Sequence, residues 1–311
     1  MADSTFDVVA MGEPLYEFNQ LVGCGDWLGG YGGDTSNTAV AAARLGGKVA
    51  YFTRLGNDAF GKRFRNLWSA EGVDHAHVKT DAAAQTGIYF VTHEPEGPTF
   101  SYWRDGSAAS RIAPIDVPPD LIRNARVLHI SAISQAISTS SCDAVLKAVE
   151  IARAAGVTVS YDTNLRHLFW PPPRVRAVTE ATAALSDILL PGLDDAQLLI
   201  GLTDADAIAD HYLARGVQIV ALTMGRNGAL IATPSARKRV ASIQVKVLDE
   251  TGAGDAFNGG FLVEWLRTGD PFLAGRFANT VAGLSTEGYG AVEPLPTRAV
   301  VEARLAQETF N

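Results

Sequence analysis

The residues best suited to carry out chemistry lie at 249–257, where the chain reads DETGAGDAF. An apolar stretch ends here, and a helix is expected to begin at about Gly254. Gly252, Ala253 and Gly254 have small side chains or none, so their N–H groups can approach an anion closely at the positive end of that helix. Asp255 follows in the first turn, where the helix dipole favours its ionised form. Such a carboxylate can accept the proton of a hydroxyl group that attacks a bound phosphate.

A second polar turn, GGDTSN at residues 32–37, precedes another expected helix. Gly33, Asp34 and Asn37 can present backbone and side-chain groups that hydrogen-bond the hydroxyl groups of a ligand. The alternative is purely structural, with Asp34 capping the helix and Asn37 lying in its first turn.

Two arginines indicate a charged substrate. Arg104 follows Tyr102 in the run YWR, and Arg166 ends the run DTNLR. The planar guanidinium group matches the geometry of a carboxylate, so the pair predicts a substrate with an acid group. The alternative is that both arginines are surface charges, with Tyr89 and Tyr102 packing between a lid and the core.

The order of the expected elements predicts an α/β fold. Strands are expected at 6–11, 49–54, 127–130, 157–162, 188–190 and 219–224, with further β structure at 228–233 and 240–247. Helices are expected at 34–45, 60–70, 139–155, 254–268, 272–287 and 297–308. This alternation is typical of a doubly wound, mainly parallel sheet with helices on both faces, which binds ligands beyond the carboxyl ends of its strands.

Two insertions, at residues 13–31 and 85–112, interrupt this alternation. In the second, β-branched and aromatic residues at 86–93 and 99–104 flank the run EPEGP, a pattern typical of a β-hairpin. We therefore predict a small β-sheet lid, formed by both insertions, on a main domain formed by residues 1–12, 32–84 and 113–311.

Composition restricts the partners and the compartment. The formal net charge of −8 gives no support for binding to nucleic acid or to an anionic membrane. No apolar run reaches the roughly 18 residues that span a bilayer. The two cysteines, Cys24 and Cys142, have no metal-ligand spacing and are too few for a disulfide framework, so a cytoplasmic protein is expected.

The run at 249–257 resembles the D-T-x-G-A-G-D-x-F signature of the ribokinase-like, or PfkB, carbohydrate kinases. This resemblance implies that Asp255 is the catalytic base and that Gly252, Ala253 and Gly254 form the anion hole for the transferred phosphate. Residues 56–61, GNDAFG, are similar to a second family element, in which we expect Asp58 to cap a helix. Residues 32–37 resemble the family's sugar-binding turn, which assigns Gly33, Asp34 and Asn37 to the substrate.

The resemblance also implies ATP as the phosphate donor. Residues 223–228 resemble the family's K-x-G-x-x-G turn, with Thr223 where lysine is frequent. Six residues are thereby assigned to the nucleotide: Thr223, Gly225, Gly228, Gly252, Gly254 and Asn279. The alternatives are a plain hairpin turn at 223–228 and an exposed polar side chain at Asn279.

Two kinds of cation are implied. Asp195 falls where the family has its N-x-x-E magnesium motif, with Gly192 in place of the asparagine and Asp195 in place of the glutamate. It would contact Mg²⁺ through water, although helix capping by Asp194 and Asp195 is an alternative. Asp249, Thr251 and Gly290 match positions around a monovalent-cation site known in several members, which makes K⁺ a candidate.

Tyr89, Tyr102, Arg104 and Arg166 resemble the sugar-acid branch of this family, the 2-keto-3-deoxygluconate kinases. That branch implies phosphorylation of the C6 hydroxyl group of a sugar acid by ATP, and a homodimer formed through the lid. Three alternatives stay open: a fructokinase, a kinase for the galactonate epimer, and a nucleotide-binding regulatory protein without activity. A dinucleotide-dependent dehydrogenase is disfavoured, because no G-x-G-x-x-G follows the first strand.

Overall fold

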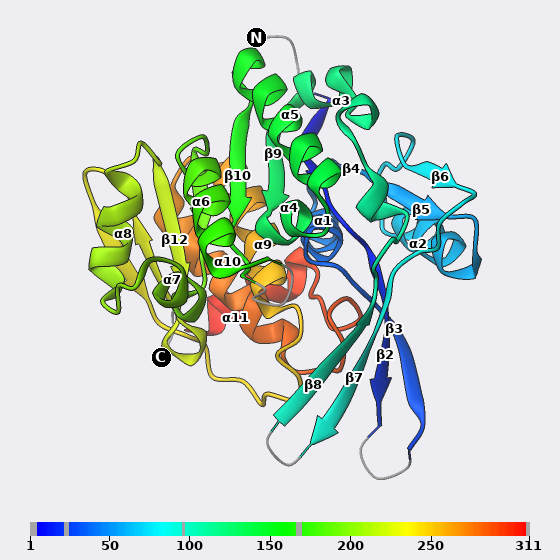
Figure 1. Cartoon of the computed structure of the whole chain (residues 1–311). Coiled ribbons are helices and arrows are strands. Elements are labelled where there is room, and N and C mark those ends of the chain that lie inside the picture. Colours follow the sequence, from blue (N-terminus) through cyan, green and yellow to red (C-terminus); the bar gives the residue numbers. More distant parts are fainter. Residues whose placement is uncertain (1–4, 22–24, 95–96, 166–169, 309–311) are drawn as a thin grey trace.

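The computed structural model describes residues 5–21, 25–94, 97–165 and 170–308. Its centre is an eight-stranded sheet in the order β14-β13-β12-β11-β10-β9-β1-β4 (Figure 1). Six strands run parallel, namely β1 (Phe6–Met11), β4 (Val49–Phe52), β9 (Ala125–Ser131), β10 (Thr158–Asp162), β11 (Ile188–Leu190) and β12 (Ile219–Thr223). Two antiparallel strands, β13 (Ala229–Ala232) and β14 (Arg237–Val240), complete one edge. The predicted fold class is confirmed.

Helices cover both faces of the sheet because the side chains of its buried strands alternate between two apolar clusters. In β1, Val8 and Ala10 belong to one cluster, whereas Val9 and Met11 belong to the other. The first cluster includes side chains of α1 (Asp34–Arg44), α2 (Ala59–Ala70), α9 (Ala253–Thr268), α10 (Pro271–Ser285) and α11 (Arg298–Glu308). The second includes side chains of α3 (Pro119–Arg123), α4 (Ala132–Ala136), α5 (Thr139–Ala155), α6 (Pro172–Ala183), α7 (Leu193–Ile200) and α8 (Ala205–Leu213).

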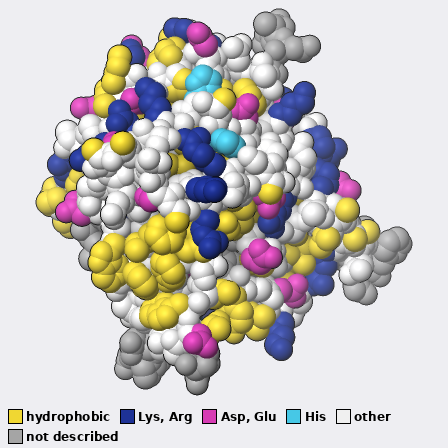
Figure 2. All heavy atoms as spheres, turned by 90° about the vertical axis from the view of Figure 1, so that its right-hand side faces the viewer, with side chains coloured by type: hydrophobic (Ala, Val, Ile, Leu, Met, Phe, Trp, Pro, Cys, Tyr) yellow, Lys and Arg dark blue, Asp and Glu magenta, His cyan; other side chains and the backbone are white. Residues whose placement is uncertain are grey.

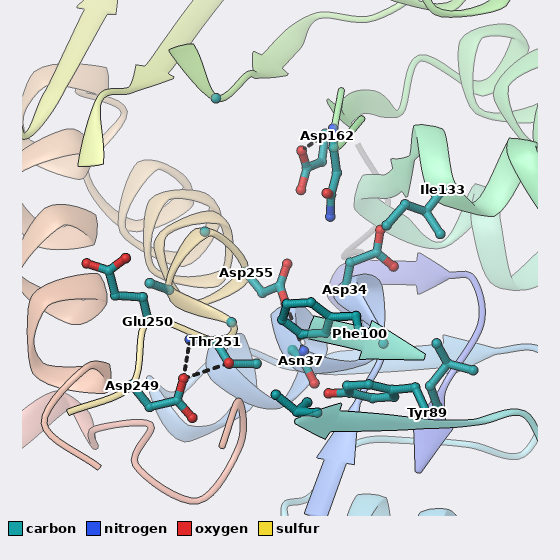
Figure 3. A pocket seen from close by; sticks show the side chains of 18 of the residues that line it. Asp34, Asn37, Tyr89, Phe100, Ile133, Asp162, Asp249, Glu250, Thr251 and Asp255 are labelled. Atoms are coloured by element: carbon teal, nitrogen blue, oxygen red, sulfur yellow. Dashed lines mark hydrogen bonds between the residues drawn. The ribbon is translucent and has the colours of Figure 1, made fainter. Parts of the chain in front are cut away.

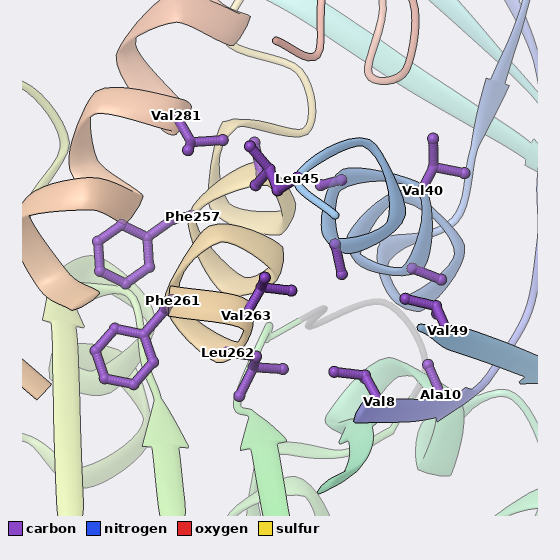
Figure 4. Packing of buried hydrophobic residues seen from close by; sticks show 14 of the residues in the cluster. Val8, Ala10, Val40, Leu45, Val49, Phe257, Phe261, Leu262, Val263 and Val281 are labelled. Carbon is purple, nitrogen blue, oxygen red and sulfur yellow. The ribbon is translucent and has the colours of Figure 1, made fainter. Parts of the chain in front are cut away.

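Helices α1 and α9 pack unusually closely against each other (Figure 4). A Cβ atom on Gly259 would lie 2.7 Å from Cβ of Ala41 and 2.8 Å from the carbonyl oxygen of Thr38. Only glycine therefore fits at this crossing. The contact brings the first turns of two helices together from opposite ends of the chain.

A separate four-stranded sheet stands off the main domain, at the lower right of Figure 1. Its order is β3 (Trp27–Gly32), β2 (Leu15–Gln20), β7 (Ile88–Glu94) and β8 (Gly97–Trp103). Strands β7 and β8 form the predicted antiparallel hairpin, and β7 pairs in parallel with β2 from the first insertion. We call this sheet the lid. A small pair, β5 (Arg54–Gly56) with β6 (Lys79–Asp81), lies beside α2.

One predicted element is wrong. The structure ends β14 at Val240, and the expected β structure at 240–247 is absent beyond that residue. The edge strand lies earlier in the chain than predicted, at Arg237–Val240, where Arg237 and Arg239 form ion pairs with Asp206 of α8. Ile243 packs directly against Gly283 of α10, so the alternating apolar side chains of this segment serve helix contact rather than strand pairing.

One local prediction, the cap on α2, is confirmed. Asp58 caps α2, with its Oδ1 accepting from the Gly61 N–H at 2.7 Å. Cys142 is buried among apolar side chains as a free thiol, while Cys24 lies outside the described residues. In the described part of the chain, no helix is long and apolar enough to cross a bilayer.

His129 of β9 provides a test of the buried core. Its ring is 1% exposed and its Nδ1 lies 3.1 Å from Oγ of Ser160. Burial lowers the pKa of His129 from 6.5 to about 3, because the charged ring would lose its hydration. The unfolded chain therefore binds one more proton than the folded chain between these two values, and folded stability falls as the pH drops through this range.

We predict that His129→Gln removes this dependence. The unfolding free energy of the wild type minus that of the variant should rise by about 1.4 kcal/mol per pH unit between pH 4 and 6. Denaturant unfolding at several pH values measures this difference. The same substitution at exposed His77 serves as the control, and a flat difference for His129→Gln would contradict the burial argument.

Candidate active site

A cavity of about 650 Å³ lies beyond the carboxyl ends of the parallel strands, between the main sheet and the lid. It is lined by residues at or just after the ends of five of these strands: Glu13 after β1, Ile133 after β9, Asp162 of β10, Gly192 after β11 and Thr223 of β12. The start of α9 and the lid complete its walls. Parallel strands explain this convergence, because their carboxyl ends all reach the same edge of the sheet.

Asp255 faces this cavity from the first turn of α9 (Figure 3). The side chain amide of Asn37, in the first turn of α1, donates a hydrogen bond of 2.8 Å to Oδ2 of Asp255. Asp255 is 8% exposed and its backbone carbonyl accepts from Oγ1 of Thr38 at 3.3 Å. The close packing of α1 and α9 thus holds a carboxylate in a fixed position at the cavity wall.

The small residues before Asp255 form a tight turn into α9. Gly252 has φ of 76°, and a Cβ atom there would lie 2.6 Å from Cβ of Ala291. Both the left-handed backbone and this short distance therefore require glycine. The Ala253 N–H donates to the Glu250 carbonyl at 3.2 Å. Gly254 lines the cavity, and a Cβ atom there would meet nothing within 4 Å. First-turn N–H groups of a helix lack partners within the helix and suit an anion.

The lid contributes an aromatic wall. The ring of Tyr89 is stacked near those of Tyr102 and Phe100, with centroids 5.8 and 6.4 Å apart, and all three residues line the cavity. The Tyr89 hydroxyl donates to the carboxylate of Glu17, which is 1% exposed. Burial raises the pKa of Glu17 and that of Tyr89.

Arg104 lies at the root of the lid and lines the cavity. It is 8% exposed, its guanidinium forms an ion pair with Glu13, and it lies 5.6 Å from the ring centroid of Tyr102. The alternative that Arg104 is a surface charge is therefore wrong. Glu13 was missed by sequence reasoning. The sequence did contain a signal for Glu13, because this charged residue follows directly after a predicted buried strand and Gly12.

Asp162 is a second residue that the sequence analysis did not assign. Its Oδ2 accepts from the Asn258 side chain at 2.8 Å, and its Oδ1 accepts from the Asn164 N–H at 2.9 Å. Burial, with the nearby charges of Asp34 and Asp195, raises the pKa of Asp162 to about 7. Near neutral pH Asp162 is therefore protonated in a fraction of the molecules, and the protonated form can donate a hydrogen bond.

The comparisons with known proteins decide the family. Residues 3–298 match the model of the pfkB family carbohydrate kinases. The chain belongs to this family. It is a carbohydrate kinase with a ribokinase-like fold, as the resemblance in its motifs predicted.

Its relatives include kinases for two kinds of sugar. The chain is 33% identical to the 2-dehydro-3-deoxygluconokinase of Thermoproteus tenax, over 98% of this chain and 95% of the relative. It is also 31% identical to a protein named probable fructokinase-3 of Arabidopsis thaliana, over 96% of this chain and 91% of that one. A solved fructokinase double mutant from Vibrio cholerae O395, holding fructose, ADP and a potassium ion, superposes with a TM-score of 0.87 at 29% identity, covering 97% of this chain and 99% of that one.

The residues assigned to the nucleotide fall into two groups in this kinase. Thr223, Gly252 and Gly254 line the cavity, whereas Gly225, Gly228 and Asn279 do not. Residues 223–228 connect the antiparallel strands β12 and β13, so the turn is a hairpin connection. A Cβ atom on Gly228 would lie 1.9 Å from the Val240 carbonyl, and the Asn279 amide donates to the Ala241 carbonyl at 2.6 Å.

The residues assigned to cations lie at two places, and Asp195, Asp249 and Thr251 line the cavity whereas Gly290 does not. Asp195, in the first turn of α7, accepts from the Leu165 N–H at 3.0 Å. The Oδ1 atom of Asp249 accepts from the N–H and hydroxyl groups of Thr251 at 2.9 and 2.6 Å (Figure 3), and its Oδ2 accepts from the Gly290 N–H at 2.8 Å. This carboxylate thus ties the turn before α9 to the loop that follows α10.

The predicted substrate residues Gly33, Asp34, Asn37, Tyr89, Tyr102, Arg104 and Asp255 all line the cavity. Gly33 adopts φ of 99° at the start of α1, where it and not Asp34 is the N-cap residue. Arg166 lies outside the described residues.

The cavity has a strong excess of acidic groups. Seven of its lining residues carry carboxyl groups: Glu13, Asp34, Asp162, Asp195, Asp249, Glu250 and Asp255. Arg104 is the one arginine or lysine among the described lining residues. An anionic ligand would therefore be repelled unless cations accompany it or this guanidinium receives it.

We predict different effects for alanine at Gly252 and at Gly254. Gly252→Ala should lower the unfolding free energy by at least about 1 kcal/mol, because of its left-handed backbone and the contact with Ala291. Gly254→Ala should leave stability within about 0.5 kcal/mol and lower kinase activity, because the added methyl group enters the open space at the start of α9. Thermal unfolding and ATP turnover test both, and full activity of Gly254→Ala would exclude an anion beside this residue.

Proposed function

We propose that this kinase transfers the γ-phosphoryl group of ATP to the C6 hydroxyl group of 2-keto-3-deoxy-D-gluconate, giving 2-keto-3-deoxy-6-phosphogluconate and ADP. The observation that carries the proposal is the buried guanidinium of Arg104 in a cavity whose other charged lining residues are acidic. A sugar acid offers the carboxylate that such a group binds. The relative named 2-dehydro-3-deoxygluconokinase supports the same substrate.

In this proposal Asp255 is the general base. Its carboxylate takes the proton of the C6 hydroxyl as that oxygen forms a bond to the γ-phosphorus and the bond to the ADP oxygen breaks. Asn37 holds the carboxylate through the 2.8 Å hydrogen bond. The backbone at Gly252, Ala253 and Gly254, at the start of α9, stabilises the negative charge on the transferring group.

The sugar acid would lie under the lid. The rings and hydroxyl groups of Tyr89 and Tyr102 would form the wall of the cavity beside the sugar. Arg104, with Arg166, would bind the carboxylate of the sugar acid. Gly33, Asp34 and Asn37 would hydrogen-bond its hydroxyl groups. Covering by the lid would keep water from the γ-phosphate and limit hydrolysis of ATP.

The donor set of the cavity fits cations that are bound mainly by the substrates. Among the described residues, no group of three or more His, Cys, Asp or Glu side chains could hold a metal ion. That suits Mg²⁺, which keeps several waters and binds phosphate oxygens, with Asp195 contacting it through water. Mg²⁺ supplies charge neutralisation for the phosphates. The oxygen atoms of Asp249 and Thr251, with the backbone of Gly290, suit a monovalent cation such as K⁺.

The nucleotide would extend over Thr223 and the start of α9. We retain Gly225, Gly228 and Asn279 as proposed contacts on that side, beside the hairpin connection. The close packing of Gly228 on the Val240 carbonyl and the hydrogen bond from Asn279 to the Ala241 carbonyl give these two residues a structural role as well.

A fructokinase is the second candidate, supported by the pairing of Arg104 with Glu13. A guanidinium whose charge is already balanced does not require an acid substrate, and fructokinases are among the relatives. A kinase for the galactonate epimer shares every feature named above.

We further propose a homodimer through the outer face of the lid. Phe18, Trp27, Phe90 and Trp103 form an aromatic cluster there, in which Phe90 lies 4.9 Å from Trp103 between ring centroids. Trp103 is 62% exposed and Trp27 is 42% exposed, and Figure 2 shows apolar side chains gathered over the lid. Exposed patches of this kind mark protein interfaces. The few cysteines support a cytoplasmic location.

We predict that Asp255→Asn lowers kcat by about 10²-fold or more and leaves the melting temperature nearly unchanged, because the amide cannot accept the hydroxyl proton. ADP release should be measured with Mg-ATP and 2-keto-3-deoxygluconate, its galactonate epimer, gluconate, fructose or ribose. Turnover by the variant at the wild-type rate would overturn the role of Asp255. Turnover of fructose or ribose alone by the wild type would retain Asp255 and overturn the sugar-acid proposal.

A further inference from the structure

Glu13 occupies an unusual place in this molecule. It lies between β1 of the main sheet and β2 of the lid, is 2% exposed, and lines the cavity. One carboxylate oxygen receives the guanidinium of Arg104 and the other accepts from the Ser107 hydroxyl. A buried carboxylate with two such partners is held in one position, and removal of its charge would leave the buried guanidinium of Arg104 without this ion pair.

The pair lies at the point where both insertions join the main domain. Glu13 begins the first insertion, whereas Arg104 and Ser107 end the hairpin of the second, and the Ser107 N–H donates to the Arg104 carbonyl at 3.0 Å. Gly87, just before β7, is packed against this group. A Cβ atom there would lie 2.5 Å from Leu15, 3.0 Å from Oε1 of Glu13 and 3.4 Å from Cβ of Arg104.

We propose that Glu13 is a positioning residue for substrate recognition: it fixes the guanidinium of Arg104 at the root of the lid so that the planar group faces the acid end of the sugar. This inference rests on the proposed function and adds to it a residue that the motifs do not contain. A guanidinium has five N–H donors and can serve two carboxylates at once, so Glu13 and a substrate carboxylate can share it.

The electrostatics of the cavity explain why a positioning carboxylate is needed. A cation at 8% exposure requires a partner in the empty enzyme, and without Glu13 it would turn toward another of the acidic lining residues. Binding of the substrate would then require the guanidinium to be reoriented. Glu13 and the ring of Tyr102 together define one orientation before the substrate arrives.

The test is a double-mutant cycle between Glu13→Gln and Arg104→Met, measured on the full-length protein with Mg-ATP and the sugar that the wild type phosphorylates best. We expect Glu13→Gln to raise KM for the sugar acid about tenfold or more, with kcat and KM for ATP within about threefold. The double variant should be no worse than Arg104→Met alone, because Glu13 acts through Arg104. Asp120→Asn, at an exposed carboxylate, is the matched control.

Three outcomes would overturn the proposal. These are an unchanged KM in Glu13→Gln, additive effects in the double variant, and a parallel rise of both KM values with a lowered melting temperature, which marks a purely structural pair. Failure of the proposed function gives a different result, since the wild type would then phosphorylate only neutral sugars. In that case the double-mutant cycle is measured with the neutral sugar. Non-additive effects of Glu13→Gln and Arg104→Met would still support Glu13 as the residue that positions Arg104. Additive effects would overturn both the role of Glu13 and the sugar-acid proposal.

Discussion

The close packing of α9 on α1 is the constraint on which the site depends. Gly259 lets the two backbones approach, and the apolar side chains of Leu45 and Val263 lie beside the contact. The carboxylate of Asp255 and the amide of Asn37 that holds it therefore come from helices more than 200 residues apart in sequence. A slightly wider crossing would separate the two side chains while leaving both helices intact.

The second organising feature is the way in which the cavity carries its negative charge. Buried carboxylates lower stability unless they are paired, hydrogen-bonded or protonated. Each case occurs here: Glu13 is paired with Arg104, Asp249 is bonded to Thr251 and Gly290, and the raised pKa of Asp162 favours its neutral form. Such a site is suited to phosphates that arrive with a cation, and to another anionic group only where the guanidinium of Arg104 receives it.

The walls of the cavity are divided between the two parts of the molecule. The main sheet and α9 supply Asp255 and the glycine turn, the residues proposed for phosphoryl transfer. The lid and its root supply Tyr89, Tyr102 and Arg104, which line the cavity and are the residues proposed for substrate recognition. This division is consistent with relatives that share about a third of their residues with this chain yet are named for different sugars.

Much of this protein was predictable from local sequence. The alternating apolar strands and helices predicted the fold class, and the hairpin pattern at 86–104 predicted the lid strands β7 and β8. That Asp255 and its glycines lie at a turn into a helix was predictable, because such a turn is a local feature. The strand expected at 240–247 was wrong, because the apolar alternation there serves packing of Ile243 on α10, a contact that the pattern alone does not distinguish from strand pairing.

The sequence by itself determined most of the elements, the family signature and about half of the cavity residues, since each of these depends on short-range spacing. Tertiary structure alone decided which of them meet. The partners of Arg104 and Tyr89 are Glu13 and Glu17, which belong to no motif and approach only when the two insertions form one sheet. The raised pKa of Asp162 likewise arises from burial and from neighbours on other strands and helices. Charge pairing and desolvation depend on distances in space, and linear spacing does not specify those distances.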